Sequence, residues 1–252
     1  MALKPISMDK LQRIVCLVIA NYGMGKTSLL RTILGQEYQG KDEDGTDTWT
    51  PVPEGAPKVC VLTAESGLLS VRDLVMSGHV EGYEIESFQD MRDAYMALST
   101  DKEMQDRYRW VFIDSLTEIS DRCMESAKKT AGDNGYAKWE EYEATMKTLV
   151  KGFRDLPHYS TVFTCLPSVD KDEQNRRFIA PAIAMKSLKE KLPSYFDEVF
   201  FLDDVAGADG QPYRTMITQP YNRYPAKDRS GRLAFFEKPD LRHVHNKILG
   251  GK

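Results

Sequence analysis

Residues 20–27 read Ala-Asn-Tyr-Gly-Met-Gly-Lys-Thr and lie between an apolar, strand-like run and a helical pattern. Their spacing is that of a phosphate-binding loop in which alanine replaces the first glycine. Gly23 and Gly25 allow the backbone to turn its N–H groups toward an anion, and a helix opening near Lys26 adds its N-terminal partial charge. The stretch therefore predicts strand, loop and helix in succession, the beginning of a nucleotide-binding α/β fold.

The side chains of this loop have separate expected roles. Lys26 is expected to reach the β- and γ-phosphates of ATP, and the hydroxyl of Thr27 to ligate Mg²⁺. A glycine-rich turn that matches by chance is the alternative, and the strand and helix on either side argue against it. The residues expected to bind the nucleotide are Asn21, Tyr22, Gly23, Met24, Gly25, Lys26, Thr27 and Ser28.

Apolar runs and helical patterns alternate along the whole chain. Strands are expected at Ile14–Ala20, Val59–Thr63, Trp110–Asp114, Thr161–Cys165, Glu198–Leu202 and Tyr213–Thr218. Helices are expected at Lys26–Leu34 and at Ala137–Leu156, whose apolar stripe from Trp139 to Phe153 is expected to pack on the sheet. Nearly continuous apolar strands are typical of parallel sheets covered by helices on both faces. We therefore predict one doubly wound α/β domain over residues 1–252, with a mostly parallel central sheet.

The composition limits the kind of partner that the chain can have. The 252 residues carry a net charge of −4, so a nucleic-acid contact must come from a local patch and not from bulk charge. No apolar run approaches the ~20 residues that span a membrane, which predicts a soluble, intracellular protein without a membrane partner. The cysteines are far apart in sequence, so we expect reduced, buried thiols at Cys16, Cys60, Cys123 and Cys165.

Two carboxylates follow apolar strands and are candidates for chemistry at the phosphates. Asp114 ends the run Arg109-Trp-Val-Phe-Ile-Asp, where it is expected to hold Mg²⁺, usually through water. Glu65 follows the run Val59–Thr63. If the two strands lie near each other, Glu65 faces the γ-phosphate and is expected to orient the attacking water and accept its proton. The alternatives are an ordinary acidic turn at Asp114 and a helix cap at Glu65.

The ordered set of motifs resembles the RecA-like ATPases. The phosphate loop is followed by Thr63-Ala64-Glu65 and then by Ile113-Asp-Ser-Leu-Thr-Glu-Ile119. More narrowly, the chain is similar to the phage-encoded single-strand annealing ATPases, which it also matches at Phe153–His158, Leu192–Val199 and Tyr224–Gly231. The resemblance covers residues 14–240. It implies a RecA-like ATPase of DNA recombination, annealing or replication in the host cytoplasm, with a phage single-strand binding protein as a further partner.

The resemblance also implies a homo-oligomer. RecA-like subunits pack head to tail with ATP at the junction, and the neighbour supplies positive residues to the γ-phosphate. Lys227 and Arg229 fit that role by position, and alternation along a strand or hairpin edge would direct both side chains the same way. The alternative is a solvated basic turn, because Lys-Asp-Arg-Ser-Gly is also an ordinary turn sequence.

The segment Pro167–Leu188 falls where RecA-like proteins carry a mobile DNA-binding loop. Phosphate contacts and one stacking surface for single-stranded DNA are expected from Lys171, Arg176, Arg177 and Phe178. Acidic neighbours at 170, 172 and 173 dilute the charge, so a plain surface loop is the alternative. Just before this segment, Cys165 and Leu166 replace the usual polar sensor, and we expect nucleotide and loop to communicate differently here.

Two other segments receive simple interpretations. Gln36–Pro57, acidic and rich in Gly, Pro and Thr, is expected to be a surface excursion. His243 and His245 would share one face of a strand, but with no further ligand nearby we expect a surface pair and not a metal site. Two other functions stay open: a small-molecule kinase on the same fold, and an ATP-switched loader that does not depend on hydrolysis.

Overall fold

The computed structural model describes residues 8–65, 67–132, 135–171, 174–207, 210–221 and 224–250. Within them a nine-stranded sheet forms the centre of the molecule. Its parallel strands are, in spatial order, β5 (Val80–Glu84), β4 (Lys58–Thr63), β6 (Tyr108–Asp114), β7 (Ser160–Cys165), β1 (Val15–Ile19) and β10 (Glu198–Ala206). Antiparallel strands complete the β10 side: β11 (Pro212–Ile217), β12 (Lys227–Asp228) and β13 (Phe236–Glu237).

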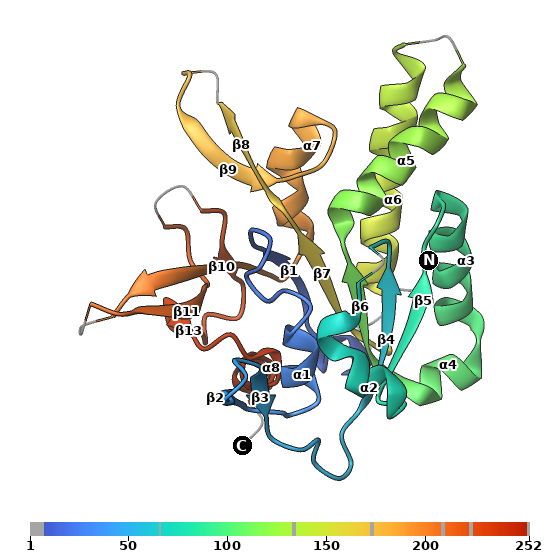
Figure 1. The fold of residues 1–252 in the computed structure, drawn as a ribbon. Helices are drawn as coiled ribbons and strands as arrows, with labels where there is room; N and C mark the ends of the chain where they lie inside the picture. The colour runs from blue at the N-terminus through green and yellow to red at the C-terminus, as the bar shows by residue number, and fades with distance from the viewer. Residues whose placement is uncertain are drawn as a thin grey trace.

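Helices cover both faces of this sheet, as Figure 1 shows. One face packs against α3 (Phe88–Thr100), α5 (Leu116–Ala131), α6 (Ala137–Asp155) and α7 (Lys186–Lys191). The other packs against α1 (Leu29–Ile33), α2 (Arg72–Met76) and α8 (Leu241–Leu249). Each β1 residue is buried, with alternate side chains entering the two cores. Burial on both faces explains the nearly continuous apolar strands, and the predicted mostly parallel α/β fold is confirmed.

The shorter elements connect these layers. They are the 3-10 turns η1 (Met8–Leu11), η2 (Leu69–Val71) and η3 (Leu192–Tyr195), the helix α4 (Lys102–Arg107), and the hairpins β2–β3 (Tyr38–Lys41, Asp47–Trp49) and β8–β9 (Pro167–Lys171, Arg177–Pro181). The predicted surface excursion thus contains a small hairpin, β2–β3. No helix among the described residues is both long and apolar enough to cross a membrane.

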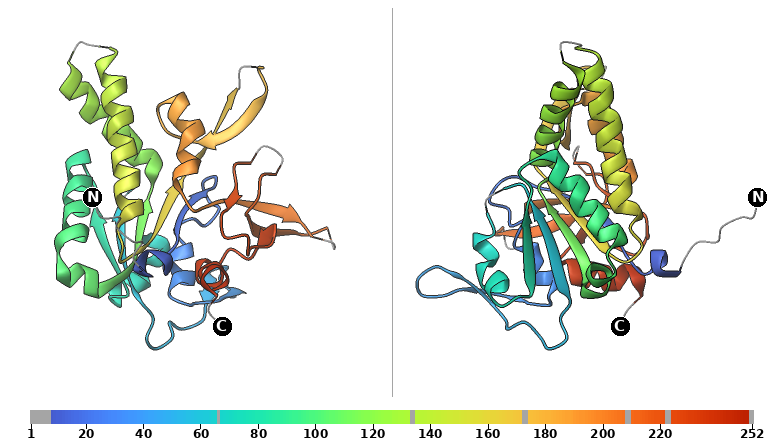
Figure 2. Two further views of the ribbon diagram at one scale, coloured as in Figure 1. Left: turned by 180° about the vertical axis from the view of Figure 1, so that it is seen from behind. Right: turned by 90° about the vertical axis from the view of Figure 1, so that its right-hand side faces the viewer.

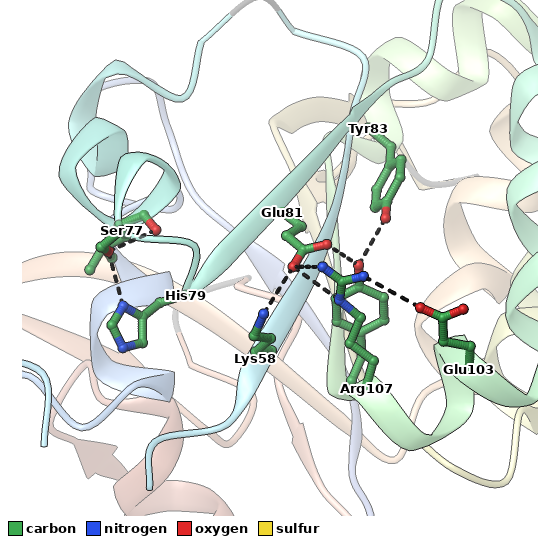
Figure 3. A network of polar contacts seen from close by, with 9 residues as sticks. Lys58, Ser77, His79, Glu81, Tyr83, Glu103 and Arg107 are labelled. Carbon is green, nitrogen blue, oxygen red and sulfur yellow. Dashed lines mark hydrogen bonds and ion pairs between the residues drawn. The ribbon is translucent and has the colours of Figure 1, made fainter. Parts of the chain in front are cut away.

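The free edge of the sheet at β5 is held by a polar network around Glu81 (Figure 3). The Glu81 carboxylate accepts hydrogen bonds from Arg107 and Tyr108 at 2.5 Å each, and Lys58 lies 3.3 Å away. Burial opposes ionisation, but these donors hold the pKa of Glu81 below its usual value. Charged side chains on an edge strand also discourage pairing with another chain. Lys58, Arg107 and Tyr108 each contact the Glu81 carboxylate, and we interpret this network as structural.

Two projections rise from the carboxyl end of the parallel strands. The α5–α6 pair and the β8–β9 hairpin both extend beyond the sheet at this end, as the two opposite views in Figures 1 and 2 show. The loop after β1 lies at the same end, because β1 and β7 are parallel and in register from Val15 to Ile19. The fold therefore gathers the phosphate loop, the ends of β4 and β6, and two projections on one side.

The predicted elements differ from the observed ones mainly at their ends. The first helix, expected at Lys26–Leu34, begins as a turn, and α1 runs only over Leu29–Ile33. The apolar stripe of α6 is buried from Tyr142 to Phe153, but Trp139 in its first turn is 38% exposed and only edges the core. The strand β5 and the helices α3, α5 and α8 were not predicted, although the buried side chains of α5, from Leu116 to Ala127, recur at helical spacing.

Candidate active site

The phosphate loop connects the end of β1 to the first turn of α1. Gly23 and Gly25 have positive φ angles of 75° and 79°, the conformation that the predicted backbone turns require. Lys26 folds back across the loop, and its Nζ donates to the carbonyl oxygens of Ala20 and Asn21 at 3.0 Å each. Burial lowers the pKa of Lys26, against the opposing pull of nearby carboxylates. The lysine is therefore held beside the space where a phosphate would lie.

Asp114 lies next to the loop and is fixed by two hydroxyl groups. Thr27 Oγ1 donates to Asp114 Oδ2 at 2.7 Å, and Thr164 Oγ1 donates to Asp114 Oδ1 at 2.5 Å. Burial raises the pKa of Asp114, and the negative charge of Glu65 adds to that effect, while the two hydroxyls and Lys26 oppose it. A buried carboxylate that costs free energy to ionise gains most from a cation placed beside it. Asp114 has the surroundings of a metal partner.

The chemistry of these oxygens fits Mg²⁺. Thr27 provides a hydroxyl and Asp114 a carboxylate, within hydrogen-bonding distance of each other. Mg²⁺ commonly takes one or two such oxygen ligands from the protein and the others from substrate phosphates and water. Among the described residues no group of three or more His, Cys, Asp or Glu side chains is placed to hold a metal by itself. A Mg²⁺ ion here would therefore depend on the phosphates of a nucleotide for most of its remaining ligands.

Glu65 lies just after β4, the strand that pairs with β6 and its terminal Asp114. β4 pairs with β6 so that Thr63 is level with Asp114, and the Ala64 N–H donates to the Asp114 carbonyl at 2.9 Å. Ser115 Oγ donates to Glu65 Oε1 at 2.6 Å. The Asp114–Ser115 peptide bond is cis. The exposed Glu65 carboxylate thus lies just beyond the end of β4, held by the serine that follows β6 and precedes α5.

Cys165, which is buried, and Leu166, which is half-buried, occupy the position where a polar sensor is usual. The Cys165 thiol lies 3.3 Å from Thr117 Oγ1, which also accepts from the Leu166 N–H at 3.0 Å. The Ala20 N–H donates to the Cys165 carbonyl at 3.1 Å. Burial raises the pKa of the Cys165 thiol to about 11, so it is neutral near pH 7. Contact between the loop and β7 therefore runs through the backbone at Ala20 and Cys165, and through Asp114, which accepts from both Thr27 and Thr164.

The structure places Lys227 and Arg229 away from the chain's own phosphate loop. Lys227 lies on β12 opposite Val199, at the amino end of β10, whereas the loop leaves the carboxyl end of β1. Lys227 Nζ donates to the Phe196 carbonyl at 2.5 Å, and Arg229 pairs with Asp197 at 2.6 Å. Both side chains reach the segment before β10, and both retain exposed surface. Their use in a neighbouring subunit stays a prediction.

The segment expected to bind DNA forms the β8–β9 hairpin. Lys171 and Arg177 are directly opposite each other, so their side chains share one face. Phe178 pairs with Asp170 and lies on the other face, half-buried, which separates the expected stacking surface from those cations. Arg176 is exposed just before β9. The acidic neighbours at 172 and 173 lie outside the described residues, and Asp170 is engaged by Lys189 at 3.5 Å.

Sequence reasoning missed three polar residues of this region. Thr164 and Ser115 hold the two carboxylates, and Arg214 from β11 lies over the loop, its Nη1 3.6 Å from where a Cβ on Gly25 would be. A threonine inside the apolar run Thr161–Cys165 was the available signal for Thr164. Arg214 gave none, because its position depends on the antiparallel pairing of β11 with β10.

The remaining sequence candidates have no part in the site. The cysteines are all free and buried, as predicted. His243 and His245 lie on α8 and not on a strand, so side chains two residues apart point to different sides. His245 packs on Trp110 with ring centroids 5.1 Å apart, while His243 lies 3.4 Å from Glu237.

Comparison with known proteins identifies the family. A family model described as AAA domain matches residues 12–230, which include the loop, both carboxylates and β12. The chain belongs to the AAA domain family. No curated protein matches its sequence. With its phosphate loop and its mostly parallel sheet, this AAA domain has the fold of a P-loop ATPase.

Solved structures similar to this AAA domain are distant in sequence. One is the flagellar accessory protein FlaH from Methanocaldococcus jannaschii, at 9% identity and a TM-score of 0.41, covering 85% of this chain and 84% of that one. Another is the assembled ATPase EscN from the type III secretion system of enteropathogenic E. coli, at 14% identity and a TM-score of 0.46. That match covers 76% of this chain and 43% of EscN.

Proposed function

We propose that the chain hydrolyses MgATP as a head-to-tail homo-oligomer and acts on single-stranded DNA in recombination, annealing or replication. The observation that carries the hydrolysis is the convergence of two carboxylates beside the phosphate loop. Asp114 is hydrogen-bonded to Thr27 of the loop at 2.7 Å. Glu65 is hydrogen-bonded at 2.6 Å to Ser115, the residue that follows Asp114. A nucleotide on the loop would thus meet a metal ligand and a general base together.

The residues of the site divide the reaction between them. The loop N–H groups and Lys26 bind the β- and γ-phosphates, and Lys26 exchanges its two carbonyl partners for phosphate oxygens. Thr27 and Asp114 would hold Mg²⁺, which would supply charge neutralisation at the phosphates. Glu65 orients a water molecule and takes its proton as the water oxygen attacks the γ-phosphorus. ADP leaves with the electrons of the broken P–O bond, and inorganic phosphate and one proton are released.

The oligomer is supported by the placement of the basic residues. Lys227 and Arg229 lie at the amino end of β10 and the loop lies at the carboxyl end of β1, so one chain presents them on opposite ends of its sheet. A head-to-tail neighbour would bring Arg229 to the γ-phosphate, where a guanidinium stabilises the charge that develops during transfer. Arg229 would then exchange its half-exposed partner Asp197 for phosphate.

The DNA role is supported by the β8–β9 hairpin. It projects from the carboxyl end of the sheet (Figure 1). Lys171 and Arg177 pair across its two strands and share one face. Two neighbouring cations on a projecting hairpin suit contacts to a phosphate backbone. The phage single-strand annealing ATPases, which the sequence resembles, provide the biological setting, and a single-strand binding protein is the further partner this implies.

ATP turnover by the purified chain, measured over a range of protein concentrations with and without single-stranded DNA, tests the proposal. Specific activity should rise with protein concentration and with DNA, and Lys26→Ala should abolish it. Turnover that is independent of both variables would remove the oligomer and the DNA role. Phosphate transfer to a nucleoside or nucleotide acceptor would favour a kinase instead, and turnover unchanged in Glu65→Gln would favour a switch.

A further inference from the structure

A cavity of about 760 Å³ continues from the phosphate loop on the side away from Asp114. Gly23, Gly25 and Ser28 of the loop form one end of it, the β2–β3 hairpin forms a wall, and Asp204 and Arg214 of β10 and β11 form another. Its size lies in the range of pockets that bind small ligands, about 300–1,000 Å³. The loop and the cavity are continuous, so one ligand can occupy both.

The sheet order sets the direction in which a bound nucleotide extends. β1 stands between β7, which leads to β6 and Asp114, and β10, which leads to β11. The metal and the terminal phosphate belong on the Asp114 side, where Thr27 and Glu65 also lie. The rest of the nucleotide must therefore extend toward β10 and β11, which is where the cavity opens.

The hairpin presents an aromatic ring in a fixed position. Tyr38 is 51% exposed, and its ring packs edge-on against Trp49 with centroids 5.3 Å apart. Its hydroxyl lies 3.2 Å from Asp47 Oδ1. Trp49 is in turn covered by the Arg31 guanidinium, 5.5 Å from the ring centroid. An exposed ring that is already oriented loses little conformational entropy when a flat base stacks on it.

The hairpin is also fixed relative to the phosphate loop, because Arg31 belongs to α1. The Arg31 guanidinium pairs with Asp73 at 2.5 Å and donates to the Ser70 carbonyl at 2.8 Å. It also donates to Gln36 Oε1 at 3.1 Å, and Gln36 Nε2 donates to the Thr50 carbonyl at 2.6 Å. The aromatic wall is thus attached to the helix that follows the loop.

The charges around the cavity decide between a nucleoside and a further phosphate group. Its lining contains four carboxylates and three cations: Glu37, Asp47, Asp204 and Asp240, with Lys41, Arg214 and Lys238. The cations are paired with carboxylates, Arg214 with Asp204 at 3.1 Å, Lys41 with Asp47 at 3.1 Å and Lys238 with Asp240 at 3.5 Å. An excess of carboxylates repels phosphate but accepts hydrogen bonds from ribose hydroxyls and an exocyclic amine.

We propose that this cavity holds the nucleoside of the nucleotide whose phosphates lie on the loop, with Tyr38 stacking on the base and Arg214 contacting the phosphates. Arg214 differs from the other two cations because it touches the loop, with Nη1 3.6 Å from the Cβ position of Gly25. The ion pair with Asp204 holds the Arg214 guanidinium beside the phosphate loop. The assignment rests on the proposed ATP site and names the residues that bind the other half of its substrate.

Equilibrium binding of two probes to the full chain tests this assignment, MgATP and inorganic tripolyphosphate with Mg²⁺. Tripolyphosphate has no nucleoside and reports on the loop alone. Tyr38→Ala should weaken MgATP binding by about tenfold or more, the usual loss of one aromatic stacking contact, and leave tripolyphosphate binding unchanged. Tyr38→Phe keeps the ring and should bind both probes like the wild type. Arg214→Ala should weaken both probes.

The controls separate this inference from the proposed function. Tyr136→Ala removes an exposed tyrosine at the start of α6, outside the cavity lining, and should change neither affinity. Unchanged tripolyphosphate binding shows that a variant is folded. MgATP binding by Tyr38→Ala equal to that of the wild type, or an equal loss for both probes, would overturn the nucleoside site while leaving the ATPase intact. A wild-type chain that binds neither probe would overturn the proposed function itself.

Discussion

Two buried carboxyl groups, Asp114 and Glu198, lie at opposite ends of the same sheet and have different surroundings. Asp114, at the carboxyl end of β6, accepts hydrogen bonds from Thr27 and Thr164. Glu198, at the amino end of β10, faces a second carboxyl group, that of Asp228 on β12. Burial raises the pKa of both, and for Glu198 the neighbouring carboxylate contributes to a value of about 8.

The difference shows what each end of the sheet can receive. Hydroxyl donors and Lys26 surround Asp114, so this end suits a cation and phosphate oxygens added to the existing groups. Glu198 needs a proton and not a ligand, and the cations next to it, Lys227 and Arg229, reach outward over the segment before β10. In the proposed head-to-tail oligomer, the site at one end of one copy would meet the half-buried Lys227 and the exposed Arg229 at the other end of its neighbour.

The sharpest test of this complementarity is Arg229→Ala. If Arg229 completes the site of a neighbouring subunit, its loss should reduce ATP turnover by about 10³-fold at high protein concentration, as for other arginines supplied in trans. ATP binding should change little, because the phosphate loop is intact. Arg232→Ala is the matched control, since Arg232 is three residues away and its guanidinium donates to the Ile248 carbonyl at 2.8 Å.

Mixing two inactive variants shows whether the arginine acts between chains. Arg229→Ala keeps an intact loop and Lys26→Ala keeps an intact Arg229, so a junction between the two can contain both. Turnover should therefore reappear in the mixture. Equal turnover in Arg229→Ala and Arg232→Ala, or no recovery on mixing, would leave the two ends of the sheet unrelated.

The next largest effect is expected at the carboxyl end itself, from Glu65→Gln. Removing a positioned general base should lower turnover by about 10²-fold or more and leave MgATP bound. Rapid-quench hydrolysis and equilibrium binding on the same samples measure the two quantities. Glu84→Gln is the control, because Glu84 is exposed at the carboxyl end of the neighbouring strand β5. A parallel loss of turnover and affinity would make Glu65 a binding residue.

The fold and half of the site were predictable because their signals are local. A phosphate loop lies within eight residues, and a buried parallel strand is largely apolar, as in β1 and in the residues of β6 that precede Asp114. Asp114 and Glu65 each end such a strand, so the sheet only had to place those strands side by side. Their pairing, level at Thr63 and Asp114, confirms the condition on which the role of Glu65 was based.

The rest depends on contacts that no local pattern contains. Thr164 and Arg214 reach the site from strands 50 and more residues beyond Asp114, through pairings that appear only in the folded sheet. The cavity wall at Tyr38 comes from a polar segment without a clear period. Phe178 was grouped with Lys171 and Arg177 by closeness in sequence, but strand alternation places it on the other face.

A smaller effect is expected at the β8–β9 hairpin, on DNA affinity. Replacing Lys171 and Arg177 together by alanine should weaken single-stranded DNA binding by about tenfold at moderate salt and reduce the salt dependence, since each cation releases counterions. Lys128→Ala with Lys129→Ala removes the same charge from the exposed end of α5 and serves as the control. Fluorescence anisotropy of a labelled oligonucleotide measures both. Equal losses from the two pairs would indicate bulk charge and not a binding face.

The smallest effect concerns Glu198 and the stability of the amino end of the sheet. Its pKa of about 8 lies above the value of about 4.3 expected in the unfolded chain, so the folded protein keeps a proton that the unfolded chain has lost. This contribution to stability is complete below pH ~4.3 and disappears as the pH rises toward 8. The pKa of Asp228 is lowered, and its effect lies below this range.

Glu198→Gln removes the titration while keeping nearly the same shape, and it therefore isolates the contribution. Between pH 5 and 8 the free energy of unfolding of the wild type should fall relative to that of the variant by at least about 1 kcal/mol, because one unit of pKa shift corresponds to about 1.4 kcal/mol. Urea denaturation at each pH gives the free energy of unfolding of the wild type and of the variant. Asp114→Asn provides the same comparison for the buried carboxyl group at the carboxyl end of the sheet. Parallel pH profiles for the wild type and Glu198→Gln would mean that Glu198 is ionised in the folded protein, and the contrast between the two ends would disappear.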